Sequence, residues 1–122
     1  MVIEFEDTDF EVSDWAISYG CCSALEYEID GDSATVHSIN AQPSGYGIGR
    51  ALCRKFEKIA VDAGCEIIFV PASLSSEALG FWTAMGYDAE NKRDCRRVKR
   101  IIEHGCNSYA DPQGVIVLEK KL

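Results

Sequence analysis

Three glycines stand within residues 45–49, directly before a stretch with the apolar spacing of a helix. Glycine has no Cβ, so its backbone N–H is uncovered and positive φ angles cost it little. The N–H groups in the first turn of a helix lack partners inside the helix, and the positive end of the helix dipole lies there. The segment therefore predicts a site for an anion such as a phosphate.

Neither common nucleotide pattern is present in this segment. Arg50 and Ala51 follow the last glycine, where Gly-x-x-x-x-Gly-Lys-Ser/Thr requires lysine and then serine or threonine. The third glycine, Gly49, comes one residue too early for Gly-x-Gly-x-x-Gly. The type of phosphorylated ligand must therefore be inferred from the residues C-terminal to the segment.

Length and composition indicate one globular domain over residues 1–122, with 47% apolar residues and a formal charge of −8. The acidic balance argues against general nucleic-acid binding. It suits a cationic partner, although an acidic surface also simply keeps a protein in solution. No apolar window is long enough to predict a membrane span.

Cysteine usage indicates a reducing environment. Residues 1–9 are acidic and lack the layout of a secretion signal, so we expect reduced, mostly buried thiols and a cytoplasmic protein. There is no Cys-x-x-Cys pair and there are only two histidines, so no metal site is expected. The cysteines are Cys21, Cys22, Cys53, Cys65, Cys95 and Cys106.

The elements that must position the glycine segment are short strands and helices in alternation. Alternating residues predict a strand at 2–6 and a β-hairpin at 24–41, whereas 10–19 fits either a short helix or a strand. The remaining predictions are a helix at 49–63 closed by Gly64, a strand covered on both faces at 66–71, a helix from an N-cap at Ser75 to Gly86, a short strand at 87–90, a helix at 91–104 and a strand at 115–118.

The glycine segment, the covered strand and the run Ala78-Leu79-Gly80-Phe81-Trp82-Thr83-Ala84-Met85-Gly86-Tyr87 follow one another in a fixed order. Together they resemble the GNAT (Gcn5-related N-acetyltransferase) superfamily. Its acetyl-CoA loop reads Arg/Gln-x-x-Gly-x-Gly/Ala, and its later helix ends in Ala-x-x-Phe-Tyr-x-x-x-Gly-Phe. The resemblance covers residues 36–88. It implies an α/β (α+β) fold of the acyl-CoA N-acyltransferase type, with a mixed, mostly antiparallel central sheet, flanking helices and an abbreviated N-terminal part.

The resemblance also implies acetyl-CoA as cosubstrate, with its pyrophosphate on the glycine segment and its pantetheine arm beside the preceding strand. Ser75 matches a position where the family often has a pantetheine-binding Asn. Trp82 stands where many members have a tyrosine that acts as general acid. The implied cofactor-binding residues are Ser38, Ile39, Asn40, Ser44, Gly45, Tyr46, Gly47, Ile48, Gly49, Arg50, Ser75 and Trp82.

Three departures from the family pattern affect the predicted chemistry. Ser44 replaces the Arg or Gln of the loop, which should weaken pyrophosphate binding without removing the backbone cradle. The indole of Trp82 donates a hydrogen bond but cannot act as an acid near neutral pH. Val70 lies where some members place a catalytic Glu.

Acetyl transfer needs a neutral amine, so a base must take a proton directly or through water. His37 is one candidate, because imidazole titrates near neutral pH and this residue lies on the strand that leads to the glycine segment. Glu26 and Glu28 on the preceding strand are alternatives. Each of the three also fits the solvent-exposed face of a hairpin.

The resemblance thus implies an N-acetyltransferase that acetylates a primary amine, either a small cationic amine or a protein lysine or N-terminus. The alternative is a catalytically silent module that binds CoA or a protein partner, which the valine and the tryptophan favour. A third hypothesis is capture of a basic protein by the acidic N-terminal part. Since that part is short, the acceptor site is expected to be open or completed by a second copy in a homodimer.

Overall fold

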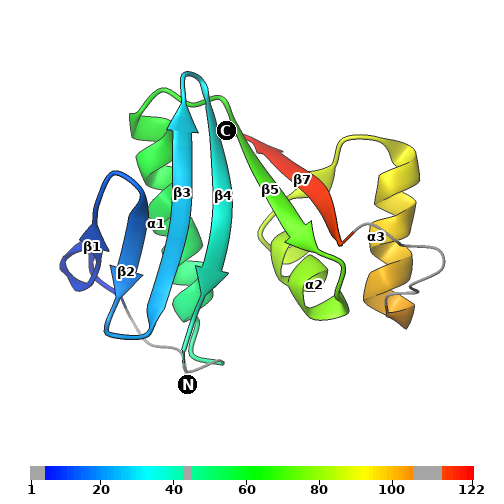
Figure 1. Cartoon of the computed structure of the whole chain (residues 1–122), viewed down its shortest axis with the longest axis horizontal. Helices are drawn as coiled ribbons and strands as arrows, with labels where there is room; N and C mark the ends of the chain where they lie inside the picture. The colour runs from blue at the N-terminus through cyan, green and yellow to red at the C-terminus, as the bar shows by residue number, and fades with distance from the viewer. Residues whose placement is uncertain (1–4, 43–44, 106–113) are drawn as a thin grey trace. The chain divides into compact units, whose positions relative to one another are not determined.

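The computed structural model describes residues 5–42, 45–105 and 114–122, which fall into two compact units. The first unit is Met1–Ile68 with Leu122, and the second is Phe69–Lys121. Among the described residues, the strands follow the order β1-β2-β3-β4 in the first unit and β5-β7-β6 in the second; all but β6 are labelled in Figure 1. With the three α-helices of the described ranges, this is the mixed, mostly antiparallel α/β architecture that the sequence predicts. The expectation of a single domain over residues 1–122 stays a prediction.

The first unit begins with short elements where the sequence was ambiguous. A 3-10 turn, η1 (Asp7–Asp9), precedes β1 (Glu11–Val12) and β2 (Ala16–Tyr19), which pair antiparallel, so the 10–19 segment is a strand pair rather than a helix.

The strand expected at 2–6 is wrong for its described residues, Phe5 and Glu6, which lie outside any strand. The Glu6 N–H donates to a carboxylate oxygen of Asp9 at 2.8 Å, and the Asp9 N–H donates to the Glu6 carbonyl at 3.0 Å. These two bonds close a tight turn, which removes the extended backbone that a strand needs. Residues 2–4 lie outside the described residues.

The predicted hairpin is confirmed as β3 (Ser23–Asp30) and β4 (Ser33–Asn40), joined at a turn in which Gly31 has φ +63°. The ladder shifts by one residue between Glu26, which pairs with Ser38, and Tyr27, which pairs with Val36. His37 is therefore an extra, unpaired residue, and β4 carries a β-bulge at this point.

The helix α1 (Ile48–Asp62) lies behind the β3–β4 hairpin in Figure 1 and forms the core of the first unit. It ends at Ala63, followed by Gly64 with φ +87°, as predicted. Phe56 is fully buried with its ring centroid 5.3 Å from that of Tyr27. Burying such a side chain contributes about 1.5–3 kcal/mol. The buried residues of α1 are Ile48, Leu52, Cys53, Phe56 and Ala60.

The second unit holds all of β5 (Ile67–Ser73) except its first two residues, together with α2 (Ser76–Ala84), β6 (Asp88–Ala89), α3 (Lys92–His104) and β7 (Val115–Lys121). β6 and β7 pair antiparallel.

The prediction that the strand at 66–71 is covered on both faces is wrong. Ile68, Val70 and Ala72 are buried, but Ile67 and Phe69 are half-buried and Pro71 is exposed. The strand is nearly all apolar, yet only the face with Ile68, Val70 and Ala72 is fully buried, and the other face is covered only in part.

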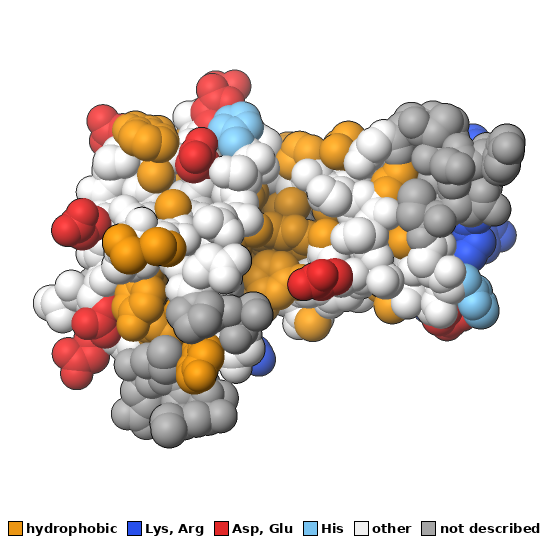
Figure 2. Space-filling model, turned by 60° about the horizontal axis from the view of Figure 1, so that its bottom comes forward, with side chains coloured by type: hydrophobic (Ala, Val, Ile, Leu, Met, Phe, Trp, Pro, Cys, Tyr) orange, Lys and Arg blue, Asp and Glu red, His pale blue; other side chains and the backbone are white. Residues whose placement is uncertain are grey.

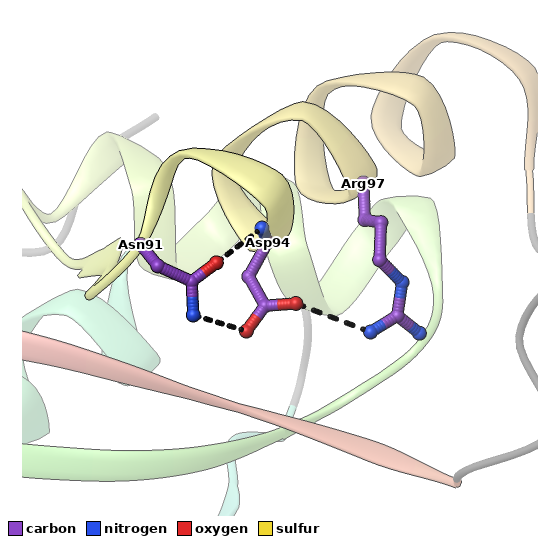
Figure 3. Close-up of polar contacts among 3 residues, drawn as sticks. All are labelled: Asn91, Asp94 and Arg97. Atoms are coloured by element: carbon purple, nitrogen blue, oxygen red, sulfur yellow. Dashed lines mark hydrogen bonds and ion pairs between the residues drawn. The ribbon is translucent and has the colours of Figure 1, made fainter.

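Both helices of the second unit start at side-chain caps. Ser75 accepts a hydrogen bond from the Ala78 N–H at 3.1 Å, as an N-cap should. At α3, Asn91 accepts from the Asp94 N–H at 2.8 Å and donates from its amide to the Asp94 carboxylate, which also lies 3.3 Å from Arg97 (Figure 3). These contacts explain why the two helices begin at Ser76 and Lys92.

No described helix is long and apolar enough to cross a membrane. The five described cysteines are free thiols, but the expectation of mostly buried thiols holds only in part. Cys53 and Cys65 are buried and Cys95 is half-buried, whereas Cys21 and Cys22 are exposed. Cys106 lies outside the described residues.

Candidate functional site

The backbone at the start of α1 turns sharply at the glycines. Gly47, the N-cap, is left-handed, with φ +81° and ψ 13°, and right-handed helix begins at the next residue. Adjacent left- and right-handed residues turn successive N–H groups toward one point, an arrangement called a nest. Here the N–H groups of Gly47, Ile48 and Gly49 form the nest. Gly45, which precedes it, also has a positive φ of +87°.

Within the described residues, few protein groups compete with an anion for these amides. No side chain caps α1, and its first turn contains no acidic residue. The Ala51 N–H is bonded to the Gly47 carbonyl at 3.0 Å, so the helical ladder starts only after the nest. A Cβ added at Gly45 would meet no atom within 4 Å, so a ligand has room there. Ser44 lies outside the described residues, so its predicted role stays a prediction.

A row of cations runs along α1 from the nest, and of its members only Arg50 was predicted from the sequence. Arg50, Arg54 and Lys58 are exposed and spaced by four residues, so they share one helix face. The first Lys or Arg of the chain is Arg50, whereas residues 1–49 contain ten Asp and Glu. The i, i+4, i+8 spacing is the signal that could have identified this row.

Charge is therefore distributed unevenly over the chain. On the face shown in Figure 2, Asp and Glu stand out over the part formed by the first unit, and Lys and Arg gather at the end where α3 lies. Six of the twelve Lys and Arg residues lie in α3.

The predicted pantetheine residues form the end of β4. Ser38 and Asn40 are exposed and Ile39 is half-buried. The Asn40 side-chain amide donates to the Cys22 carbonyl at 3.1 Å. It is thus held by the β2–β3 turn, and the roles predicted for these three residues remain untested.

Two of the three candidate bases lie side by side. His37 Nε2 is 3.3 Å from a carboxylate oxygen of Glu28, and both side chains are more than half exposed, at 52% and 67%. Both residues lie on the exposed face of the hairpin, since Glu28 pairs with Thr35, two residues before His37 on β4. Glu26, paired with Ser38, is also exposed.

The two predicted residues of the second unit have structural partners. The Ser75 hydroxyl oxygen caps α2, which leaves its O–H free to donate. Trp82 is 4% exposed, with its ring centroid 5.2 Å from that of Tyr87 and 5.0 Å from that of Phe81. Val70 is 2% exposed. The ring contacts of Trp82 place it in the core of this unit.

Three ionisable groups of the first unit have shifted pKa values. Burial, with a smaller effect of Asp14, raises the pKa of Tyr27, whose hydroxyl donates to the Ser13 carbonyl at 2.6 Å. Burial, followed by the charge of Asp32, raises the pKa of the Cys65 thiol. The hydrogen bond with Cys21 is the main cause that raises the pKa of Cys22. None of these groups lies in the glycine segment. Across the described ranges, no group of three or more His, Cys, Asp or Glu residues could hold a metal ion.

Comparison with known proteins identifies the fold. No family model and no curated protein sequence matches the chain. Solved structures do match. A Lactobacillus plantarum protein assigned as an N-acetyltransferase aligns with a TM-score of 0.60 and 18% identity, over 88% of this chain and 66% of that one. Tetrahymena Gcn5 aligns with a TM-score of 0.56 and 17% identity, over 82% and 59%.

Rv2747 from Mycobacterium tuberculosis, solved in complex with CoA, aligns with a TM-score of 0.55 and 19% identity, over 99% of this chain and 74% of that one. The chain thus has the GNAT fold that the sequence motifs predict. It spans less than two thirds of the length of the Lactobacillus plantarum and Tetrahymena proteins.

Proposed function

We propose that this chain is an N-acetyltransferase that moves an acetyl group from acetyl-CoA to a primary amine. The observation that carries the proposal is the nest at residues 47–49, whose amides have no side-chain cap within the described part of the chain. The shared fold adds support, since one structure with this fold was solved with CoA. The acceptor would be a small cationic amine or a protein lysine or N-terminus.

The pyrophosphate of CoA fits the chemistry of this segment. Its oxygens are anionic acceptors, and hydrogen bonds to charged groups contribute about 1.5–3 kcal/mol each. Arg50 and Arg54 supply positive charge beside the nest in a unit that is otherwise acidic. The protein would thus hold the ligand mainly by backbone, with Tyr46 and Arg50 exposed at its edge.

Bound acetyl-CoA supplies an activated thioester. In the transfer a C–N bond forms between the amine and the acetyl carbon, the C–S bond breaks, and the amine proton passes to a base. His37, oriented by Glu28 at 3.3 Å, is one candidate, and Glu26 or Glu28 acting through water is the other. No dedicated acid is required, because positioning alone contributes several kcal/mol to lowering a barrier.

The charge of the first unit favours a cationic acceptor. Residues 1–49 contain ten carboxylates and no Lys or Arg, so their summed field attracts an ammonium group and raises its local concentration. Because attack requires the neutral amine, the base acts after this attraction. Association with a cationic acceptor should therefore weaken as ionic strength rises.

Isothermal titration calorimetry with acetyl-CoA tests the first step, and release of free CoA thiol in the presence of a panel of amines tests the second. We expect saturable binding and amine-dependent thiol release. Absence of detectable binding at high micromolar acetyl-CoA would refute the proposal.

The second candidate is a catalytically silent module that binds CoA. Val70 and Trp82 favour it, because both are buried and neither carries a titratable group where family members place catalytic residues. CoA binding without thiol release for any amine would support this candidate. Amine-dependent turnover would exclude it.

A further inference from the structure

The turn between β2 and β3 carries two exposed thiols that the proposed acetyl transfer does not use. Gly20, with φ +65°, starts the turn, and Cys21 and Cys22 follow it. Their sulfur atoms are 3.0 Å apart, joined by a hydrogen bond in which either thiol can be the donor. Both side chains are accessible to a reagent from solution.

Adjacency along the chain disfavours a disulfide between these thiols. The Cα atoms of neighbouring residues are about 3.8 Å apart across a trans peptide. Disulfides usually join Cα atoms that are about 4.4–6.8 Å apart, and departures store strain that makes the bond easily reduced. A third atom that bonds both sulfurs avoids this strain, because the sulfurs can stay close to their present separation.

We propose that Cys21 and Cys22 form a two-thiol binding site for a thiophilic trivalent metalloid, with trivalent arsenic as the ligand. Arsenic(III) has pyramidal geometry, which places two sulfur ligands on the same side of the atom. A linear two-coordinate ion would instead need the sulfurs on opposite sides. The observed pair, with both sulfurs together at 3.0 Å, suits the pyramidal centre.

The reaction balances without an oxidant or a reductant. An organic arsenoxide exchanges its oxygen for two thiols: two As–S bonds form, the arsenic–oxygen bond is lost, and the oxygen leaves as water with both thiol protons. Arsenic stays trivalent throughout. Once the first bond forms, the second thiol is held beside the arsenic, so closure of the ring is intramolecular and strongly favoured.

The other described cysteines cannot offer this arrangement. Cys53 and Cys65 are buried, and the half-buried Cys95 donates its thiol to the Ala89 carbonyl at 3.2 Å. Within the described residues, a pair of neighbouring exposed thiols occurs only in this turn.

Closing the ring should alter the hydrogen bonds of the residues that lead into the glycine segment. The Cys22 carbonyl accepts from the Asn40 amide at 3.1 Å. Next to it, Ser23 donates to the Gln42 carbonyl at 3.0 Å and accepts from the Gln42 N–H at 2.8 Å. A ring that fixes the side chains of Cys21 and Cys22 changes the orientation of the peptide between them. It should therefore also change the hydrogen bonds that Asn40 and Gln42 make with this turn.

The test uses the reduced 122-residue chain and phenylarsine oxide as the probe. Intact-mass spectrometry should show one probe per chain with loss of one water. The adduct should survive excess monothiol and be removed by a dithiol. Cys21→Ser and Cys22→Ser should each weaken retention on the order of 100-fold, because chelation is lost. Cys95→Ser and Cys106→Ser are the matched controls and should retain the probe like the unchanged chain.

Two-dimensional NMR provides a second readout, independent of CoA binding and turnover. The probe should shift the resonances of the Asn40 side-chain amide and the Gln42 N–H. The proposal is overturned if Cys21→Ser retains the probe as strongly as the unchanged chain, if the probe maps to another cysteine, or if neither resonance moves.

Discussion

Replacing Gly47 by alanine tests whether the left-handed N-cap binds the ligand. Gly47 has φ +81°, a region in which a residue with Cβ is strained by roughly 1–2 kcal/mol. The alanine variant can keep this conformation and lose stability, or relax it and turn the nest amides away from one another. In both cases the arrangement that presents three N–H groups to one anion becomes less favourable.

The matched control lies at the other end of the same helix. Gly64 has φ +87°, and a Cβ added there would meet no atom within 4 Å. Gly64→Ala should therefore introduce the same backbone strain, and both variants should lose about 1–2 kcal/mol of the free energy of unfolding. Urea denaturation followed by circular dichroism measures this loss.

The two variants should differ in ligand affinity alone. Loss of a single hydrogen bond to a charged phosphate oxygen is a change of about 1.5–3 kcal/mol, which corresponds to roughly 10- to 150-fold in the dissociation constant. Calorimetry with acetyl-CoA at one fixed salt concentration should show this weakening for Gly47→Ala and not for Gly64→Ala. Equal affinity of both variants, whether reduced or unchanged, would refute the role of the nest.

Three further predictions concern the positive charge beside the nest, the base for acetyl transfer and the core of the first unit. Arg54→Ala should weaken acetyl-CoA binding several-fold at low ionic strength and hardly at high salt, which calorimetry at two salt concentrations measures. His37→Gln should slow amine-dependent thiol release by about 10²–10⁴-fold with unchanged acetyl-CoA affinity, and an unchanged rate would assign the base to Glu26 or Glu28. Tyr27→Phe should cost about 1 kcal/mol near neutral pH, because the hydrogen bond to the Ser13 carbonyl is lost. Because burial raises the pKa of Tyr27 in the folded chain, its neutral phenol contributes fully below the unfolded value near 10 and less as the pH rises above it. The free energy of unfolding, measured by urea denaturation from pH 8 to 11, should thus fall less steeply for this variant than for the unchanged chain. Parallel curves would contradict the raised pKa of Tyr27.

Elements with local signals could be predicted from the sequence. The apolar spacing of α1, the glycine after its end and the Ser75 cap each act within a few residues, and the structure shows all three. The ordered motifs also predicted the GNAT fold. Apolar content alone did not predict which side chains are buried, because burial depends on partners that are distant in the sequence. In α2, the apolar run 78–82 does not indicate which side chains are covered: Leu79 is fully buried, whereas Phe81 is half-buried.

The pairing of His37 with Glu28 could not be predicted for a different reason. In the register that begins with Asp30 opposite Ser33, a regular hairpin would place His37 opposite Glu26, and no residue in 24–41 indicates that the ladder shifts and gives this place to Ser38. The one-residue shift between Glu26 and Tyr27 is set by how the two strands meet. The sequence therefore supplied the candidate bases but not which of them lie together.

The same shift makes His37 an insertion that the hairpin does not need. Without it, Val36 would still pair with Tyr27 and Ser38 with Glu26, so the strands on either side would join into one uninterrupted ladder. Every other residue would keep the face it has now, including the buried Leu25 and its partner Ile39. A chain that lacks only this residue should be at least as stable as the unchanged one. Any activity that it loses can then be assigned to His37.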